Sequence, residues 1–258
     1  MKLLLPKLQR LAFNSSSIIL FFIFWEFGPR LIPEGVISPA SDAIIALFKV
    51  AASGILWEQT LISLERVVMG FSLSVLIGVP LGFLLGTFFE SAEKALLPFL
   101  RTCEKLNPFA IIPIFMIFFG IGTLEKVVVI FWSTLWPVLF NTMTGARNMD
   151  RNLLKAARSM GTTRWELLRK VILPYALPNI FIGIEIAAQI AFFMIIASEV
   201  IGASTGLGWF YISSTHRYEL ALMYGIVLYI TILAIGVNVT FARLKKRFLV
   251  WKEASQLS

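Results

Sequence analysis

Charged residues are scarce in this chain. Asp, Glu, Lys and Arg together make up 15% of its 258 residues, whereas hydrophobic residues make up 58%. A soluble domain usually carries about 25% charged residues, and a chain of this length has too little interior to hide so much apolar surface. The mean hydropathy of +0.82 points the same way. The composition therefore indicates a protein whose solvent is the lipid bilayer.

Cysteine and histidine are almost absent, with Cys103 and His216 as the single residue of each type. One cysteine cannot form an intrachain disulfide, and one histidine excludes a His-rich metal site. We expect the two residues on opposite sides of the membrane, so they form no catalytic pair. The sequence also has no Gly-x-Ser-Gly nucleophile motif and no Gly-x-x-x-x-Gly-Lys-[Ser/Thr] phosphate loop. We therefore expect no catalytic residue, no metal and no cofactor bound by this chain.

The net charge of +8 does not indicate nucleic-acid binding here. The basic residues fall in short blocks between apolar runs, which is typical of cytoplasmic loops beside anionic headgroups. If the first segment begins inside, the inner segments hold 18 of the 23 Lys and Arg residues and the outer segments hold five, among them Arg66 and Lys126. This bias predicts that both termini are cytoplasmic and that the bilayer, not nucleic acid, is the partner of the basic surface.

Six apolar runs approach the roughly 20 residues that a membrane-spanning helix needs. They predict an all-α polytopic protein that forms a single membrane domain over residues 1–258, with spans at residues 14–32, 67–89, 106–122, 127–145, 175–197 and 220–242. The first run is expected to stay as an anchor, because no small-residue cleavage site follows it. Within the first outer connection, residues 33–60, an amphipathic surface helix is predicted over Ala43–Ala52.

The longest cytoplasmic loop, residues 148–174, has the pattern of a helix, a glycine and a second helix. Asp150 is a good N-cap, and Leu153, Leu154, Ala157 and Met160 recur at helical spacing. Gly161 follows them as a C′ residue. Periodicity alone leaves two interpretations open: a basic loop that lies on headgroups and only sets orientation, or a helix that docks on a partner.

A resemblance decides between them. The segments Lys155-Ala156-Ala157, then Gly161 after three intervening residues, and Leu173-Pro174 resemble the cytoplasmic loop of ABC importer permeases, in which Glu usually stands where this chain has Lys155. Further segments resemble the nitrate/sulfonate/taurine/bicarbonate branch of these permeases, which includes relatives for thiamine-pyrimidine precursors and riboflavin. These segments are Ser38–Ser41, Thr60–Gly70, Gly78–Gly86, Phe119–Gly122 and Ala197–Gly208.

The resemblance implies a type I importer transmembrane domain in a bacterial inner membrane. Two copies would form the pathway, two cytoplasmic ATPase subunits would bind ATP, and an extracytoplasmic solute-binding protein would deliver substrate. The alternative is a stand-alone secondary carrier or channel, which would not need the cytoplasmic docking helix. The resemblance assigns the coupling to the ATPase to Leu154, Lys155, Ala156, Ala157, Met160 and Gly161.

Acidic residues at membrane depth are candidates for the pathway. Glu185 and Gln189 lie one helical turn apart, and Glu199 ends the same run. They either line the pathway or form buried pairs with another helix. The following segment is either a re-entrant outer gate or an ordinary turn, and its candidate gate residues are Gly202, Ser204, Thr205 and Gly206. Glu185 favours a small organic solute over a strongly anionic one.

Three glycines, Gly78, Gly82 and Gly86, recur every fourth residue in the second predicted span. This spacing lets membrane helices approach closely. It serves either packing within one subunit or a seam between two copies.

Overall fold

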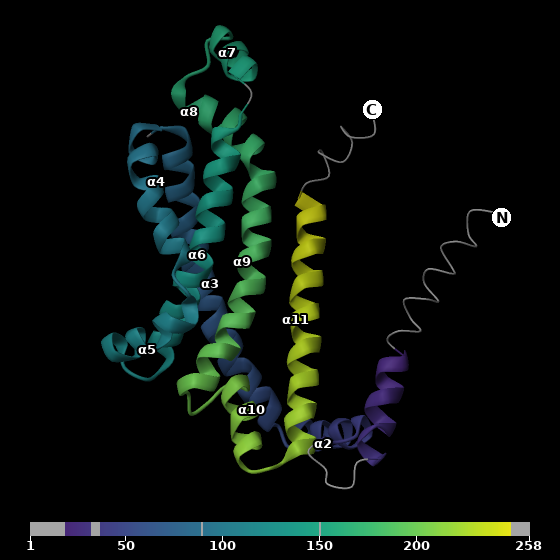
Figure 1. Ribbon diagram of the computed structural model, residues 1–258. Helices are drawn as coiled ribbons and strands as arrows, with labels where there is room; N and C mark the ends of the chain where they lie inside the picture. Colours follow the sequence, from purple (N-terminus) through teal and green to yellow (C-terminus); the bar gives the residue numbers. More distant parts are fainter. Residues whose placement is uncertain (1–18, 32–36, 89, 150, 249–258) are drawn as a thin grey trace, which may run out of the picture. The chain divides into compact units, whose positions relative to one another are not determined.

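The computed structural model describes residues 19–31, 37–88, 90–149 and 151–248, and these are helical with no strands among them (Figure 1). After a helix over residues 19–27, the elements are η1 (Pro29–Leu31), α2 (Ala40–Ala52), α3 (Ile55–Thr87), α4 (Glu90–Lys105), α5 (Pro108–Phe119), α6 (Thr123–Arg147), α7 (Arg151–Ser159), α8 (Arg164–Leu167), η2 (Leu168–Ile172), α9 (Leu173–Gly202), α10 (Leu207–His216) and α11 (Leu220–Phe248). Asp150, the predicted N-cap, lies outside the described residues.

The chain forms two compact units. One comprises residues 1–59 and 210–231, and the other comprises residues 60–209 and 232–258. The single domain predicted over residues 1–258 stays a prediction. All the predicted site residues lie in the second unit.

In the first unit, the N-terminus of α2 is held by a carboxylate from the preceding helix. Pro39 occupies the N-cap position and makes no side-chain cap. Instead, the backbone N–H of Ser41 donates to Glu26 Oε2 at 2.9 Å, and the Ser41 hydroxyl donates to Glu26 Oε1 at 2.9 Å. A carboxylate suits a helix N-terminus because the first N–H groups have no helical partner. The helix expected over Ala43–Ala52 is therefore confirmed, three residues longer at its start.

The second unit is built on the pair α6 and α9, which lie side by side along much of their length (Figure 1). Small residues allow this approach: a Cβ on Gly183 would lie 2.8 Å from the carbonyl oxygen of Pro137. The middle of α6 is buried almost all round, with Ile130 and Val138 fully covered. A helix that is apolar on most faces and covered on most faces is the central element of its domain.

Helix α3 packs on α6 through its glycines. A Cβ on Gly86 would lie 2.5 Å from the carbonyl oxygen of Met143, and one on Gly78 would lie 3.0 Å from Val138. At Gly82 an added Cβ would overlap the carbonyl oxygen of Leu139. Backbone therefore meets backbone along this face, and the glycine series serves packing within one chain.

The span predicted at residues 106–122 has a different form in the structure. Residues 90–105, expected as a cytoplasmic segment, form α4, and after a break the chain continues as α5 at an angle of 91°. The 12 residues of α5 are too short to cross a bilayer alone, since a helix rises about 1.5 Å per residue. Asn107 accepts from the N–H of Phe109, and Pro108 occupies the first turn, so a new helix starts here.

Among the described residues, four helices are long and apolar enough to cross a membrane, and the bent pair α4 and α5 makes a fifth if it counts as one span. The four are Ile55–Thr87, Thr123–Arg147, Trp165–Gly202 and Leu220–Lys245. The second predicted span thus begins at Ile55 and not at residue 67, which shortens the outer connection. The first predicted span, residues 14–32, is described only from residue 19 to 31.

Candidate coupling site and membrane cavity

Helix α7 ends as the sequence predicts. Gly161 has φ +76°, a left-handed conformation that side chains disfavour, and an added Cβ would meet open space. The N–H of Met160 bonds to the carbonyl oxygen of Ala156 at 3.1 Å, and the Thr162 hydroxyl bonds to that of Ala157 at 2.8 Å. The carbonyls of Ala156 and Ala157 in the last turn of α7 are therefore satisfied before the chain turns.

The six candidate coupling residues divide between two faces of α7. Lys155, Ala156 and Gly161 are exposed, and Met160 is 83% exposed. Leu154 and Ala157 are half-buried and pack inward. Flexible apolar side chains such as that of Met160 are common at binding surfaces.

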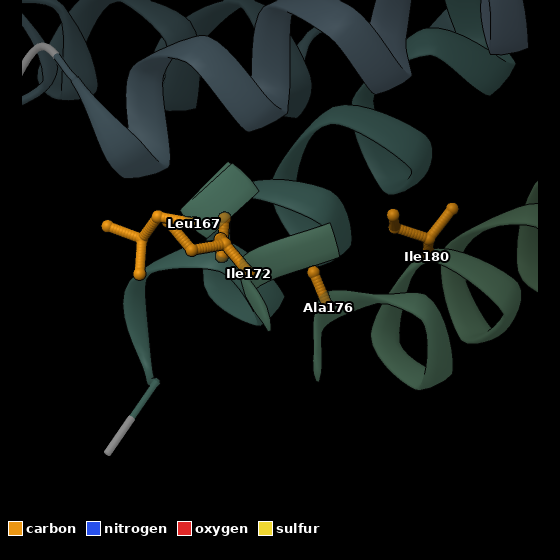
Figure 2. Packing of buried hydrophobic residues seen from close by; sticks show 5 residues of the cluster. Leu167, Ile172, Ala176 and Ile180 are labelled. Carbon is orange, nitrogen blue, oxygen red and sulfur yellow. The ribbon is translucent and has the colours of Figure 1, made fainter. Parts of the chain in front are cut away.

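The inward face of α7 joins an apolar cluster that reaches into the membrane helices (Figure 2). Leu167, Ile172, Ala176 and Ile180 are its buried core, together with Ala146 of α6. Leu154 and Ala157 pack against this core from α7, and Val79 and Phe83 pack against it from α3. The cluster therefore joins α7 to α3, α6 and α9 through close-packed side chains.

The second half of the loop runs without a break into α9. Thr163 and Glu166 form a capping box at the start of α8: the N–H of Thr163 donates to Glu166 Oε2 at 3.1 Å, and the N–H of Glu166 donates to the Thr163 hydroxyl at 3.3 Å. The π-helical turn η2 then leads into α9, whose first turn contains Pro174. Proline lacks an N–H, so the regular hydrogen-bond ladder cannot continue through this point.

Glu199 lies at the centre of a buried polar network. Its carboxylate accepts from the Ser63 hydroxyl at 2.9 Å, from Arg66 Nη1 at 2.8 Å and from the N–H of Gly208 at 2.9 Å. Arg66 also donates to the carbonyl oxygen and the hydroxyl of Thr205 at 3.0 and 2.9 Å. In this conformation Glu199 is fully buried and fastens the Gly-rich segment to α3.

The candidate gate residues Thr205 and Gly206 contact the same network. Gly206 has φ +109°, and a Cβ there would overlap the carboxylate of Glu199. Lys126 of α6 donates to the carbonyl oxygen of Gly202 at 2.8 Å and to Glu125 Oε2 at 2.8 Å. The segment from Gly202 to Gly208 is thus held from α3 and from α6. A gating role for Gly202, Ser204, Thr205 and Gly206 stays a prediction.

Glu185 and Gln189 share a face of α9, as predicted, and that face meets α11. Lys245 Nζ donates to Glu185 Oε2 at 2.8 Å, and Gln189 Nε2 donates to Asn238 Oδ1 at 3.1 Å. In this conformation Glu185 is therefore paired with a basic residue on another helix, which was one of the predicted alternatives. A pathway role for the two residues stays a prediction.

A cavity of about 650 Å³ lies among α4, α5, α6 and α9. One ion pair on its wall joins Arg101 Nη1 and Glu104 Oε2 at 2.9 Å, and the Arg101 guanidinium lies 3.8 Å from the centroid of the Phe140 ring. Its other walls are largely aromatic, from Phe109, Trp132, Trp136, Phe140 and Phe193. The residues Ile186 and Ile190, each next to a predicted pathway residue, also line it.

Comparison with known proteins identifies the family to which the chain belongs. The family model described as the binding-protein-dependent transport system inner membrane component matches residues 78–249. The chain belongs to this family. It is the permease subunit of an ABC importer, as the loop at Lys155–Gly161 suggested. Membership implies an ATPase and a binding protein as partners of the permease.

Two curated relatives and one solved structure are similar to the permease. It is 31% identical to the putative aliphatic sulfonates transport permease protein SsuC of Bacillus subtilis, over 74% of this chain and 69% of that protein. It is 26% identical to the taurine transport system permease protein TauC of Escherichia coli, over 90% and 86%. A chain of the MetNI methionine ABC transporter in an inward-facing conformation superposes with a TM-score of 0.64 at 19% identity, over 75% of the permease and 96% of that chain. This last likeness shows the fold.

Sequence reasoning missed Ser63 and Arg66 as partners of Glu199, and it missed the Arg101–Glu104 pair. It placed Arg66 and Lys126 in outer segments, and in the structure both are buried side chains of helices α3 and α6. One signal was available for Arg66: a lone arginine within a long apolar run needs an acidic partner at membrane depth.

Proposed function

We propose that α7 of this permease docks on a cytoplasmic ATPase through its exposed face, and that the cluster behind it carries ATPase motion into the membrane helices. The observation that carries the proposal is the division of α7: Lys155, Ala156 and Met160 are exposed, while Leu154 and Ala157 are packed on the cluster. One face is free for a partner and the other is already joined to the membrane helices.

The proposal extends to the assembly. Two copies of the permease form the pathway, two ATPase subunits bind the ATP, and an extracytoplasmic solute-binding protein delivers a small organic solute or oxyanion. The relatives named for aliphatic sulfonates and taurine support this substrate range. The basic bias of the predicted inner segments supports a bacterial inner-membrane orientation with both termini cytoplasmic.

The cavity lined by Arg101 and Phe140 belongs to the pathway in this proposal. It has the size of a small-molecule site, and it lies against α6 and α9, the helices that the coupling cluster joins to α7. Motion of α7 would therefore change the walls of this cavity directly.

The test is co-purification of an ATPase with the gently solubilised permease, identified by mass spectrometry and by ATP hydrolysis. Wild type is compared with Gly161→Asp and with the matched control Gly54→Asp. Both glycines have positive φ, at +76° and +85°, and open space around the Cβ position, so the two variants carry the same backbone strain. We expect wild type and Gly54→Asp to bring down the ATPase and Gly161→Asp to lose it.

Failure of the wild type to bring down an ATPase would remove the docking role of α7 and favour a stand-alone carrier. Equal recovery with both glycine variants would place the docking surface elsewhere.

A further inference from the structure

The cavity among α4, α5, α6 and α9 is electrically balanced. Its charged side chains are Arg101 and Glu104, which neutralise each other. A ligand with a net negative charge would find one favourable and one unfavourable partner here. A ligand with one charge of each sign matches both.

The Arg101–Glu104 pair can exchange partners at small cost. The Arg101 side chain is 50% exposed and that of Glu104 is 26% exposed. Ion pairs of such exposure contribute little to stability, so each group is free to turn to a ligand charge. The Arg101 guanidinium also lies over the Phe140 ring, and this contact holds it at the cavity wall while it changes partner.

Aromatic rings complete the site. Phe109 and Phe193 both line the cavity and meet edge to face with centroids 5.8 Å apart, and their exposed fractions are 43% and 60%. Exposed aromatic faces beside a carboxylate attract an organic ammonium group, because the ring face is electron-rich. An inorganic oxyanion such as bicarbonate gains nothing from them and fills little of this volume.

Resting on the proposed function, we infer that the permease carries a small organic zwitterion. Its acid group pairs with Arg101, and its ammonium group lies between Glu104 and the exposed rings of Phe109 and Phe193. This narrows the substrate range of the pathway and assigns specificity to the permease cavity.

The test uses the purified permease–ATPase complex in nanodiscs and pairs of matched probes. Taurine is paired with isethionate, in which a hydroxyl replaces the ammonium group. Glycine betaine is paired with tert-butylacetate, in which a carbon atom replaces the charged nitrogen. Affinity is measured by calorimetry. We expect each zwitterion to bind about tenfold more tightly than its anionic partner, as one cation–π contact and one partly exposed charge pair predict.

Variants assign the two charges. Glu104→Gln should reduce the preference for the zwitterion to near unity, whereas Arg101→Gln should weaken both members of each pair. Lys105→Gln, on the same helix and outside the cavity lining, should leave affinity and preference unchanged. A thermal melt of each variant confirms folding, and the wild-type comparison alone remains decisive if a variant fails to fold.

The inference is overturned if the anionic probes bind as tightly as the zwitterions, if neither zwitterion binds, or if folded Glu104→Gln keeps the wild-type preference. Any of these results with the ATPase still co-purifying leaves the proposed coupling role standing. Loss of the ATPase from the wild-type preparation would contradict the proposed function itself.

Discussion

Arg66 and Glu199 form a buried ion pair with side chains 7% and 0% exposed. Removing one member of such a pair leaves an uncompensated buried charge and costs about 3–5 kcal/mol. We therefore expect Arg66→Met to lower the thermal midpoint of the detergent-solubilised permease strongly. The double variant Arg66→Met/Glu199→Gln should recover part of the loss, because no charge is then left unpaired. A double variant that melts no higher than Arg66→Met would contradict this account of the network.

Gly82 offers a second residue-scale prediction. A methyl group there would overlap the carbonyl oxygen of Leu139, which is backbone and cannot move aside. Gly82→Ala should cost about 1–3 kcal/mol through overpacking and lower the thermal midpoint. The control is Gly236→Ala in α11, where an added Cβ meets open space. It should leave the midpoint unchanged or raise it, because alanine favours helix. Equal shifts for the two variants would argue against the close approach of α3 and α6.

The charges show where sequence reasoning stops at this scale. Glu199 was recognisable as a special acidic residue, but its partner Arg66 lies 133 positions away in the chain. A count of basic residues along the sequence assigned Arg66 and Lys126 to the outer side. Such a count carries no information on which basic side chains are buried. Gly161 was predictable, since a helix end followed by glycine is a local pattern.

At the scale of elements, α7 carries a prediction about coupling as distinct from docking. Leu154→Ala removes a contact with the cluster and leaves the exposed face of α7 intact. We expect the ATPase to stay bound while ATP-driven uptake into proteoliposomes falls about tenfold, within the usual range of coupling free energies. Leu153, its neighbour, is 49% exposed, so Leu153→Ala should lower uptake only as far as it weakens ATPase binding. Loss of the ATPase with Leu154→Ala would assign that residue to docking.

The helices themselves were largely predictable, and the bent pair α4 and α5 was not. Long apolar runs set the positions of α3, α6, α9 and α11. Residues 90–105 carry enough charge to look like a loop, yet Leu97, Leu100 and Cys103 pack against the aromatic residues of α6. Whether a segment with one apolar stripe forms a packed helix depends on the surface that the stripe contacts, and for α4 that surface lies elsewhere in the chain.

For the whole molecule, the bent pair decides the topology. If both termini are cytoplasmic, the number of crossings is even, so α4 and α5 together must count as one crossing beside the first segment and the four long helices. The residues after α5 then lie outside. In a Cys103→Ser background, Ile121→Cys should react with a membrane-impermeant maleimide on intact cells, since Ile121 is 76% exposed. Leu153→Cys should react only after permeabilisation.

The reversed pattern, with Leu153→Cys labelled on intact cells and Ile121→Cys labelled only after permeabilisation, would make α4 and α5 a re-entrant hairpin if the N-terminus is cytoplasmic, and it would put the termini on opposite sides of the membrane. The pattern also tests the orientation of α7, because Leu153 lies within it.

The apolar cluster beneath α7 has a consequence for building hybrid transporters. Its residues come from outside the loop as well as within it: Val79 and Phe83 stand on α3, and Ala176 and Ile180 stand on α9. A graft of residues 148–174 into a foreign permease would transfer the docking face of α7. It would not transfer the cluster residues on α3 and α9 that support this face. A working chimera that accepts this permease's own ATPase therefore needs the ends of α3 and α9 transplanted together with the loop.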